Sequence, residues 1–243
     1  MNNIFSFDRF LKVLKFDLKM RVPAIATTFL VFLLLPHVLH WIMSSEYAFF
    51  VNARVELYGV MIGLLMFFAP FTIYSGLREK QGKSGFLMLP ASALEKFASM
   101  VTVSLLLVPG AFLLCTFLLD SVLVLLFREY YISFVTVDFM VLLRGALTGF
   151  SVVGAALLGN AVFKGKASFK TILCLLVLAF LWGAVVTDFI LMKVSQQDAV
   201  GDIAVIGDEQ FAQLTNITAI VIFAVGVLSY CLTYWRIKKI QIS

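Results

Sequence analysis

Charged residues are scarce in this sequence. Asp, Glu, Lys and Arg make up 14% of its 243 residues, while hydrophobic residues make up 62%. Soluble domains are roughly one quarter charged and one half apolar, so a soluble globular domain is excluded. In hydrocarbon every backbone N–H and C=O must be bonded internally, which favours helices. We therefore expect an all-α, polytopic membrane protein in which residues 1–243 form a single transmembrane domain, without a soluble catalytic domain.

Histidine and cysteine are also rare, which limits the chemistry of the chain. Cys115, Cys174 and Cys231 all lie inside apolar runs and form no CxxC pair, so neither a disulfide framework nor a zinc site is expected. His37 and His40 lie near the outer end of the first apolar run, where one helix face would present both. No cysteine or further histidine completes a metal site. We predict bundle-facing or interfacial histidines, no metal and no cofactor.

Two strings in residues 76–85 are similar to catalytic or nucleotide-binding motifs. Residues 76–84 read GLREKQGKS, with five residues between the glycines where a phosphate-binding loop has four, and they follow an apolar run instead of a strand. Residues 82–85 have the GxSG spacing of intramembrane serine proteases, but the last five apolar runs contain no histidine to activate Ser84. We expect a solvated loop and no enzymatic activity.

Six long apolar runs are present, and we expect each to form a transmembrane helix. At 1.5 Å per residue, about 20 helical residues cross a hydrocarbon core of ~30 Å. The third run is longer than this, so its first two turns project from the bilayer or Pro109-Gly110 kinks it. The predicted spans are residues 24–43, 57–75, 97–127, 139–163, 171–192 and 216–235.

Two of the later segments have a distinctive composition. The fourth span contains the pairs Gly145-xxx-Gly149 and Ala155-xxx-Gly159, and such small residues let helices approach closely. Residues 193–215 are polar and form an outer segment, in which Asp208–Leu214 is expected to make one short helix.

The basic residues gather at alternate boundaries of these spans. Fifteen of the nineteen Lys and Arg residues fall in segments 1–22, 76–96, 164–170 and 236–239. The positive-inside rule leaves this pattern, so both termini and the two connecting segments are predicted to be cytoplasmic. Because the charge lies at membrane edges and not in one patch, we do not expect nucleic acid as a partner. The four remaining basic residues are Arg54, Arg128, Arg144 and Lys193.

Residues 1–22 are predicted to form an interfacial helix. Its charged residues lie around one apolar stripe, so it should lie flat against membrane lipid. Pro23 then breaks the helix and lets the chain turn into the first span. The stripe consists of Phe7, Phe10, Leu11, Leu14 and Leu18.

Residues 76–96 are expected to end in a capped helix. Ser92 and Glu95 have the Ser-x-x-Glu spacing of a capping box, and Pro90 precedes them. A helix should therefore start at Ser92, in the cytoplasm, and continue into the third span.

Two carboxylates lie within predicted spans. Asp120 is deep in the third, and Asp188 is closer to the outer end of the fifth. An ionised carboxylate is costly in hydrocarbon, so each should face protein or a water-filled cavity. Two interpretations stay open: a translocation path or proton relay, and a structural pairing with Arg144 or a hydroxyl of the bundle.

Residues 86–97, FLMLPASALEKF, resemble the short cytoplasmic signature of membrane subunits of type-2 ABC exporters, in a small bacterial branch. The layout is similar too: an interfacial helix, six spans, a polar outer segment before the last, and a short basic tail. The resemblance implies an exporter permease of the bacterial inner membrane that works as a homo- or heterodimer. It also implies a coupling helix between spans two and three that docks on a separate ABC ATPase subunit. The residues it assigns to coupling are Leu89, Pro90, Ser92, Glu95, Lys96 and Phe97.

Two other classes of function compete with this interpretation. An ion-coupled secondary transporter would use Asp120 and Asp188 as ion ligands or proton relays. An intramembrane enzyme or haem protein would use His37 and His40. Co-purification of an ATPase with the chain separates the first interpretation from both.

The topology gives the first testable prediction. A Ser84→Cys variant should be protected from a membrane-impermeant thiol reagent in intact cells, because the Lys and Arg asymmetry places residues 76–96 inside. Cysteine accessibility scanning measures this. Labelling of residue 84 from outside intact cells would contradict the predicted orientation.

Overall fold

The computed structural model describes residues 5–43, 51–78, 90–127, 139–198 and 208–242, and all regular structure within these ranges is helical. The predicted all-α fold is therefore confirmed for the described residues. The elements are α1 (Phe7–Met20), η1 (Val22–Ile25), α2 (Ala26–Met43), α3 (Val51–Ile73), η2 (Ser75–Arg78), α5 (Ala93–Val101), η3 (Thr102–Leu107), α6 (Val108–Leu126), α7 (Phe139–Val162), α8 (Ala167–Asp198) and α9 (Asp208–Ile242).

Six helical segments in the described ranges are long and apolar enough to cross a membrane, in agreement with the six predicted spans. They suggest a multi-pass membrane protein. The side on which each end of the chain lies stays a prediction. The segments are Phe7–Leu39, Glu56–Ile73, Ala93–Leu126, Gly145–Val162, Ala167–Thr187 and Thr215–Ile240.

The start of the last helix differs from the sequence prediction. No separate short helix is formed at Asp208–Leu214, because α9 begins at Asp208 and continues without a break to Ile242. Neither Gly nor Pro lies between Asp208 and Thr215, and Glu, Gln, Ala and Leu in this stretch all favour helix. The polar residues therefore extend the sixth helix by about two turns, since one turn of α-helix holds about 3.6 residues.

The third span carries a local irregularity just before its proline. α5 and α6 are joined through η3, which is a π-helical segment. Pro109 has no N–H, and its ring crowds the carbonyl of Leu105, four residues earlier. The wide turn of η3 relieves this crowding while the helix continues. The expected irregularity at Pro109-Gly110 thus takes the form of a widened turn on its N-terminal side.

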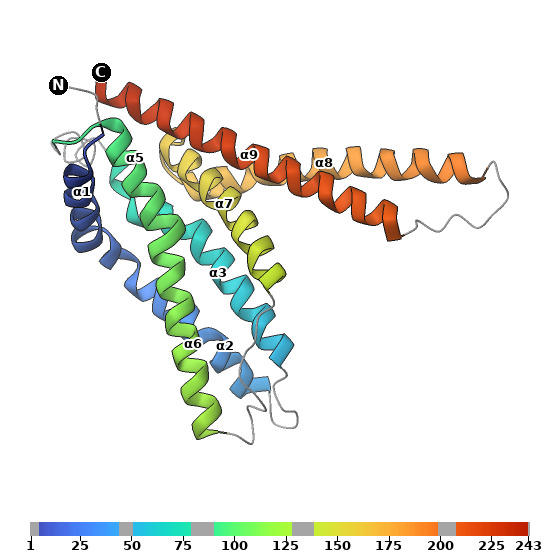
Figure 1. Cartoon of the computed structure of the whole chain (residues 1–243), viewed down its shortest axis with the longest axis horizontal. Helices are drawn as coiled ribbons and strands as arrows, with labels where there is room; N and C mark the ends of the chain where they lie inside the picture. The colour runs from blue at the N-terminus through green and yellow to red at the C-terminus, as the bar shows by residue number, and fades with distance from the viewer. Residues whose placement is uncertain (1–4, 44–50, 79–89, 128–138, 199–207, 243) are drawn as a thin grey trace.

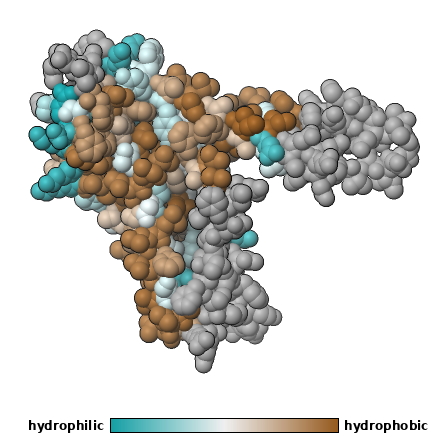
Figure 2. All heavy atoms as spheres, viewed as in Figure 1, coloured by the Kyte–Doolittle hydropathy of each residue, from teal (hydrophilic) through white to brown (hydrophobic). Residues whose placement is uncertain are grey.

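The helices form a bundle from which one pair extends. α2, α3, α5–α6 and α7 make the bundle, and α1 lies beside the start of α5. α8 and the N-terminal part of α9 reach away from it, whereas the C-terminal part of α9 lies across α7 and α5 (Figure 1). Hydrophobic side chains cover much of the bundle, and hydrophilic ones gather at the end where α1 lies (Figure 2). We call this the α1 end and the opposite one, where α2 and α6 end, the far end.

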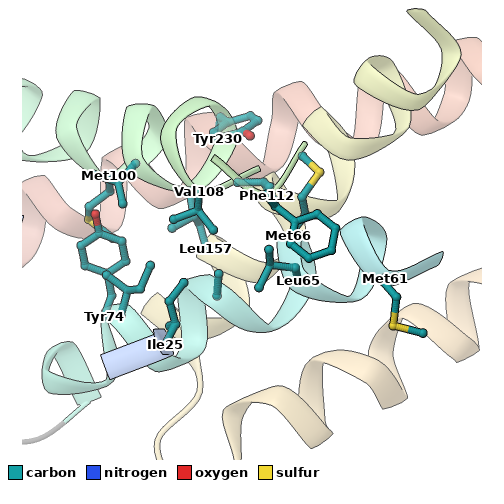
Figure 3. Packing of buried hydrophobic residues seen from close by; sticks show 14 of the residues in the cluster. Ile25, Met61, Leu65, Met66, Tyr74, Met100, Val108, Phe112, Leu157 and Tyr230 are labelled. Carbon is teal, nitrogen blue, oxygen red and sulfur yellow. The ribbon is translucent and has the colours of Figure 1, made fainter. Parts of the chain in front are cut away.

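The core lies between α3, α5–α6 and α7. Leu65 and Leu157 are fully buried, and Phe112 is 1% exposed. These side chains, with Val108, gather in the middle of the bundle (Figure 3). The core therefore separates the α1 end from the far end with apolar side chains.

Small residues of α7 allow close contact with three other helices. A Cβ on Gly154 would lie 2.9 Å from the Tyr230 ring and 3.1 Å from the Gly226 carbonyl of α9. One on Gly149 would meet Met66 of α3, and one on Gly159 would overlap Thr171 of α8. Gly145 has nothing within 4 Å of its Cβ position. The predicted close approach is therefore confirmed at Gly149 and Gly159.

The α7–α9 crossing gives the second prediction. A Cβ on Gly226 would lie 2.7 Å from Ser151 Oγ and 2.9 Å from Ser151 Cα, so Gly226→Ala must push the two helices apart. We expect it to destabilise the fold by about 1–3 kcal/mol. Thermal unfolding in detergent measures this. The matched control is Gly183→Ala in α8, where a Cβ meets nothing within 4 Å. Equal melting temperatures for the two variants would contradict the close crossing.

Candidate functional site

The residues that the sequence resemblance assigns to coupling are not gathered on one exposed surface. Pro90 is exposed and Ser92 partly exposed, but Glu95 is 0% and Lys96 1% exposed. Phe97 is half-buried. Leu89 lies outside the described residues. The two charged members of the set therefore act inside the fold, where they contact other helices of the same chain.

The predicted capping box is confirmed at the start of α5. Ser92 is the N-cap residue, and its Oγ accepts a hydrogen bond from the Glu95 amide at 3.2 Å. In return Glu95 Oε2 accepts from the Ser92 amide at 2.8 Å. Two amides of the first turn, which have no partner within the helix, are thus satisfied by side chains.

The other oxygen of Glu95 binds α1. Oε1 accepts from the Ser6 amide at 2.7 Å and from Arg9 Nε at 3.1 Å, and Arg9 Nη2 lies 3.0 Å away in an ion pair. Ser6 is the N-cap residue of α1, so the carboxylate also lies at the positive end of that helix. One buried carboxylate therefore caps α5 and holds the start of α1.

Asp17 makes a second connection near the end of α1. It is 1% exposed and pairs with Arg21 Nη1 at 2.8 Å. Its Oδ2 accepts from Ser99 Oγ of α5 at 2.7 Å and from the Tyr74 hydroxyl, just after α3, at 3.4 Å. The Arg21 guanidinium also lies over the Tyr74 ring, 5.5 Å from its centroid. Asp17 thereby joins α1 to both α3 and α5.

α7 and α9 are tied to the same region. Asn160 of α7 donates to the Tyr74 carbonyl at 3.0 Å. Phe97 packs against Tyr230 and Tyr234 of α9, with ring centroids 6.3 and 5.6 Å apart. We call this region the α1–α5 junction, defined by Ser6, Arg9, Asp17, Arg21, Tyr74, Ser92, Glu95 and Ser99.

α1 presents three faces. Val13 and Asp17 are buried against the bundle. Of the predicted apolar stripe, Phe10 and Leu14 are partly buried, whereas its other members are exposed. Those exposed members are Phe7 at 63%, Leu11 at 43% and Leu18 at 41%. The third face is basic and exposed and consists of Lys12, Lys15 and Lys19.

Sequence reasoning missed Asp17. At 100° per residue it falls with Val13 between the apolar stripe and the basic face, on neither of them. An acid in that position on an otherwise basic helix, four residues before Arg21, was the available signal. The sequence did identify Ser92 and Glu95 as a pair, but it could not show that the carboxylate also holds α1.

A second polar cluster lies at the far end. The Tyr58 hydroxyl of α3 is 3.1 Å from His37 Nε2 of α2 and donates to Asp120 Oδ1 of α6 at 3.3 Å. Asp120 is 2% and Tyr58 8% exposed. The prediction that Asp120 faces protein is confirmed, and a hydroxyl of the bundle is one of its partners. The side chains of His40, Arg144 and Asp188 lie outside the description.

The chain has further acidic residues and a second histidine besides those in the two clusters. Within the ranges the structure describes, no three His, Cys, Asp or Glu side chains come together as they would around a metal ion. What the α1–α5 junction provides is a mechanical connection between helices, and what the far-end cluster provides is a short line of exchangeable protons.

Comparison with known proteins adds no identity. No protein-family model, no curated protein and no solved structure matches this chain.

The junction gives the third prediction. Glu95→Ala should raise the exchange of α1 amides strongly, because it leaves Arg9 and the Ser6 amide without their acceptor and also removes the capping box. Leaving a buried donor without its acceptor costs about 1–3 kcal/mol, and the Arg9 end of the pair is 35% exposed. Hydrogen exchange of residues 7–20 in the purified protein measures the opening of α1.

A double-mutant cycle sharpens this test. Arg9→Ala should add little to Glu95→Ala, because both changes remove the same interaction. Lys12→Ala is the control on the exposed face of α1, and it should stay within about 0.5 kcal/mol of the parent. Full additivity of the Arg9 and Glu95 variants would show that their ion pair does not hold α1.

Proposed function

We propose that this chain is the membrane permease subunit of an ATP-driven exporter of the bacterial inner membrane. ATP is hydrolysed by a separate ABC ATPase subunit, and two permease subunits work together as a dimer. The chain itself is not an enzyme. Support comes from the resemblance of residues 86–97 to type-2 ABC exporter subunits and from the six helices of membrane-spanning length.

The observation that carries this proposal is the double attachment of α1 to α5. Glu95 binds the start of α1, and Asp17 binds Ser99 of α5 from near its end. A partner that pushes on either helix therefore moves both. Since α5 continues through η3 into α6, the movement reaches the whole length of the bundle. An exporter whose energy comes from an external subunit needs such a connection.

In this function the coupling residues have two different roles. Pro90 is exposed, and Leu94, on the first turn of α5, is 41% exposed, so these residues are available to touch the ATPase. Ser92, Glu95, Lys96 and Phe97 position the helix that presents them. The contact surface is then the first turn of α5 with the exposed basic face of α1 beside it.

η3 supplies a place where the transmitted movement can change the bundle. A π-helical turn has a wider and less regular hydrogen-bond ladder than an α-helix, and such turns are frequent at functional sites. Val103 of η3 is fully buried in the core. A shift of α5 would therefore be converted here into a repacking against α3 and α7.

The far-end cluster favours a second candidate, an ion-coupled secondary transporter that uses Asp120. A buried carboxylate bonded to a hydroxyl within three membrane-length helices is a usual setting for an ion ligand or a proton relay. Asp188 was the other predicted member of this path. In an ATP-driven exporter, by contrast, no obligatory ion site is needed.

Purification of the tagged chain from its native membrane tests the function. We expect an ABC ATPase subunit to co-purify in a fixed ratio and the complex to hydrolyse ATP in proteoliposomes. The competing result is proton or sodium flux through the chain alone, measured with pyranine or ²²Na⁺ and lost in Asp120→Asn. That result would overturn the exporter assignment in favour of the secondary transporter.

The contact surface gives the fourth prediction. Leu94→Asp should weaken co-purification of the ATPase, because an apolar side chain buried in an interface contributes about 1.5–3 kcal/mol, roughly tenfold or more in affinity. Ser92→Ala with Glu95→Ala should weaken assembly or uncouple ATP hydrolysis from transport. The matched control is Phe169→Asp, 64% exposed at the start of α8. Equal loss of the ATPase in the Leu94 and Phe169 variants would contradict a contact at α5.

A further inference from the structure

Three membrane-length helices meet at the Tyr58 hydroxyl. It lies 3.1 Å from His37 Nε2 and 3.3 Å from Asp120 Oδ1. A phenol has one proton to donate, and here it goes to the carboxylate. When the carboxylate is ionised and the imidazole is protonated at Nε2, His37 donates to the Tyr58 oxygen, and the three groups form one hydrogen-bonded line from imidazole through phenol to carboxylate.

The direction of both hydrogen bonds reverses when two protons move. The Nε2 proton passes to the Tyr58 oxygen as the phenol proton passes to Asp120 Oδ1. Starting from the imidazolium form of His37, the phenol is regenerated, the ring ends as neutral imidazole and the carboxylate ends as a carboxylic acid. No electron pair leaves the three groups and no further reactant is needed. Tyr58 thus connects an imidazole, which can both donate and accept a proton, to a deeply buried acid.

A second observation points to a ligand at the same place. Thr116 lies one helical turn before Asp120, on the same side of α6, and is 5% exposed. Its hydroxyl has no hydrogen-bond partner, although a buried hydroxyl normally has one. A water molecule bonded to Thr116 would satisfy it and extend the line of exchangeable protons by one step.

The line stops in the core. One turn beyond Thr116 is Phe112, 1% exposed, followed by Val108, 4% exposed. Neither side chain binds water. The next polar atom on this side of the third span is Ser104 Oγ, which is also buried and unpartnered. Twelve residues separate Ser104 from Thr116, about 18 Å along the helix. The line of polar side chains from the far end therefore ends at Thr116 in this arrangement.

We propose that His37, Tyr58 and Asp120 form a proton-binding relay, with His37 as the entry group and Asp120 as the buried acceptor. The relay makes contacts among α2, α3 and α6 depend on the proton content of the cluster. The relay adds a proton-binding site to the proposed exporter, and it names the groups that serve Asp120 in the second candidate function.

On the three helices of the relay, the described residues include one further charged side chain. Glu56, two residues before Tyr58 on α3, is exposed. α2 contributes no further described charge, and on α6 Asp120 is the charged residue. Arg54 and Arg144, on α3 and α7, have side chains outside the description.

The scarcity of histidine makes the relay directly measurable. The chain has two histidines, so His40→Gln leaves His37 as the single imidazole. Its proton NMR titration in the purified protein reports the proton content of the entry group. Asp120→Asn should change the apparent proton affinity of His37 by at least threefold. In a Tyr58→Phe background the same Asp120→Asn change should have less than half that effect.

Tyr74→Phe is the matched control, because Tyr74 also donates to a buried carboxylate, at the α1 end of the bundle. It should leave the His37–Asp120 coupling intact. An unchanged His37 titration in Asp120→Asn would overturn the relay, and so would a coupling of the same size with and without Tyr58.

Tyr58→Phe keeps the ring, and gel filtration with a thermal scan shows whether it folds. If Tyr58→Phe does not fold, infrared spectra of the parent protein and of Asp120→Asn test the relay. A carboxylic-acid band that titrates in the parent and is lost in Asp120→Asn supports the relay. The absence of such a band at every pH contradicts the relay.

Discussion

The arrangement of the α1 end depends on one buried carboxylate. Glu95 accepts from two amides and from the Arg9 guanidinium, and it is fully removed from solvent. A buried carboxylate is costly unless hydrogen bonds satisfy it, and here every partner is supplied by the chain itself. Loss of either α1 or the first turn of α5 would leave the group unsatisfied. The two helices are therefore obliged to stay together.

α3 carries the same chemistry at both of its ends. Tyr58 donates to Asp120 at the far end, and Tyr74 donates to Asp17 at the α1 end. Between them the bundle is filled by apolar side chains such as Leu65, Leu157 and Phe112. Polar groups thus stabilise the contacts between helices at each end, while the middle is held mainly by packing, with one hydrogen bond from the Tyr230 hydroxyl of α9 to the Phe150 carbonyl of α7.

Much of the fold could be predicted because it depends on local composition. The length of apolar runs identifies helices that can cross a membrane, and Ser92 with Glu95 identifies a helix start, since a capping box needs only residues three apart. Pro109 predicts an irregularity in the third span for the same local reason. The short helix expected at Asp208–Leu214 was wrong because polarity does not end a helix when Gly and Pro are absent.

The sequence by itself determined the number of membrane-length helices, the cap of α5 and the burial of Asp120. These follow from hydropathy and from contacts within one turn. Only the tertiary structure decided that Glu95 holds α1, that Asp17 binds Ser99 and that Tyr58 joins His37 to Asp120. Asp120, Asp17 and Glu95 each bind a partner that lies 62 to 89 residues away in the chain. Spacing carries no information about such pairs, because which faces of two helices meet is fixed by packing across the whole bundle.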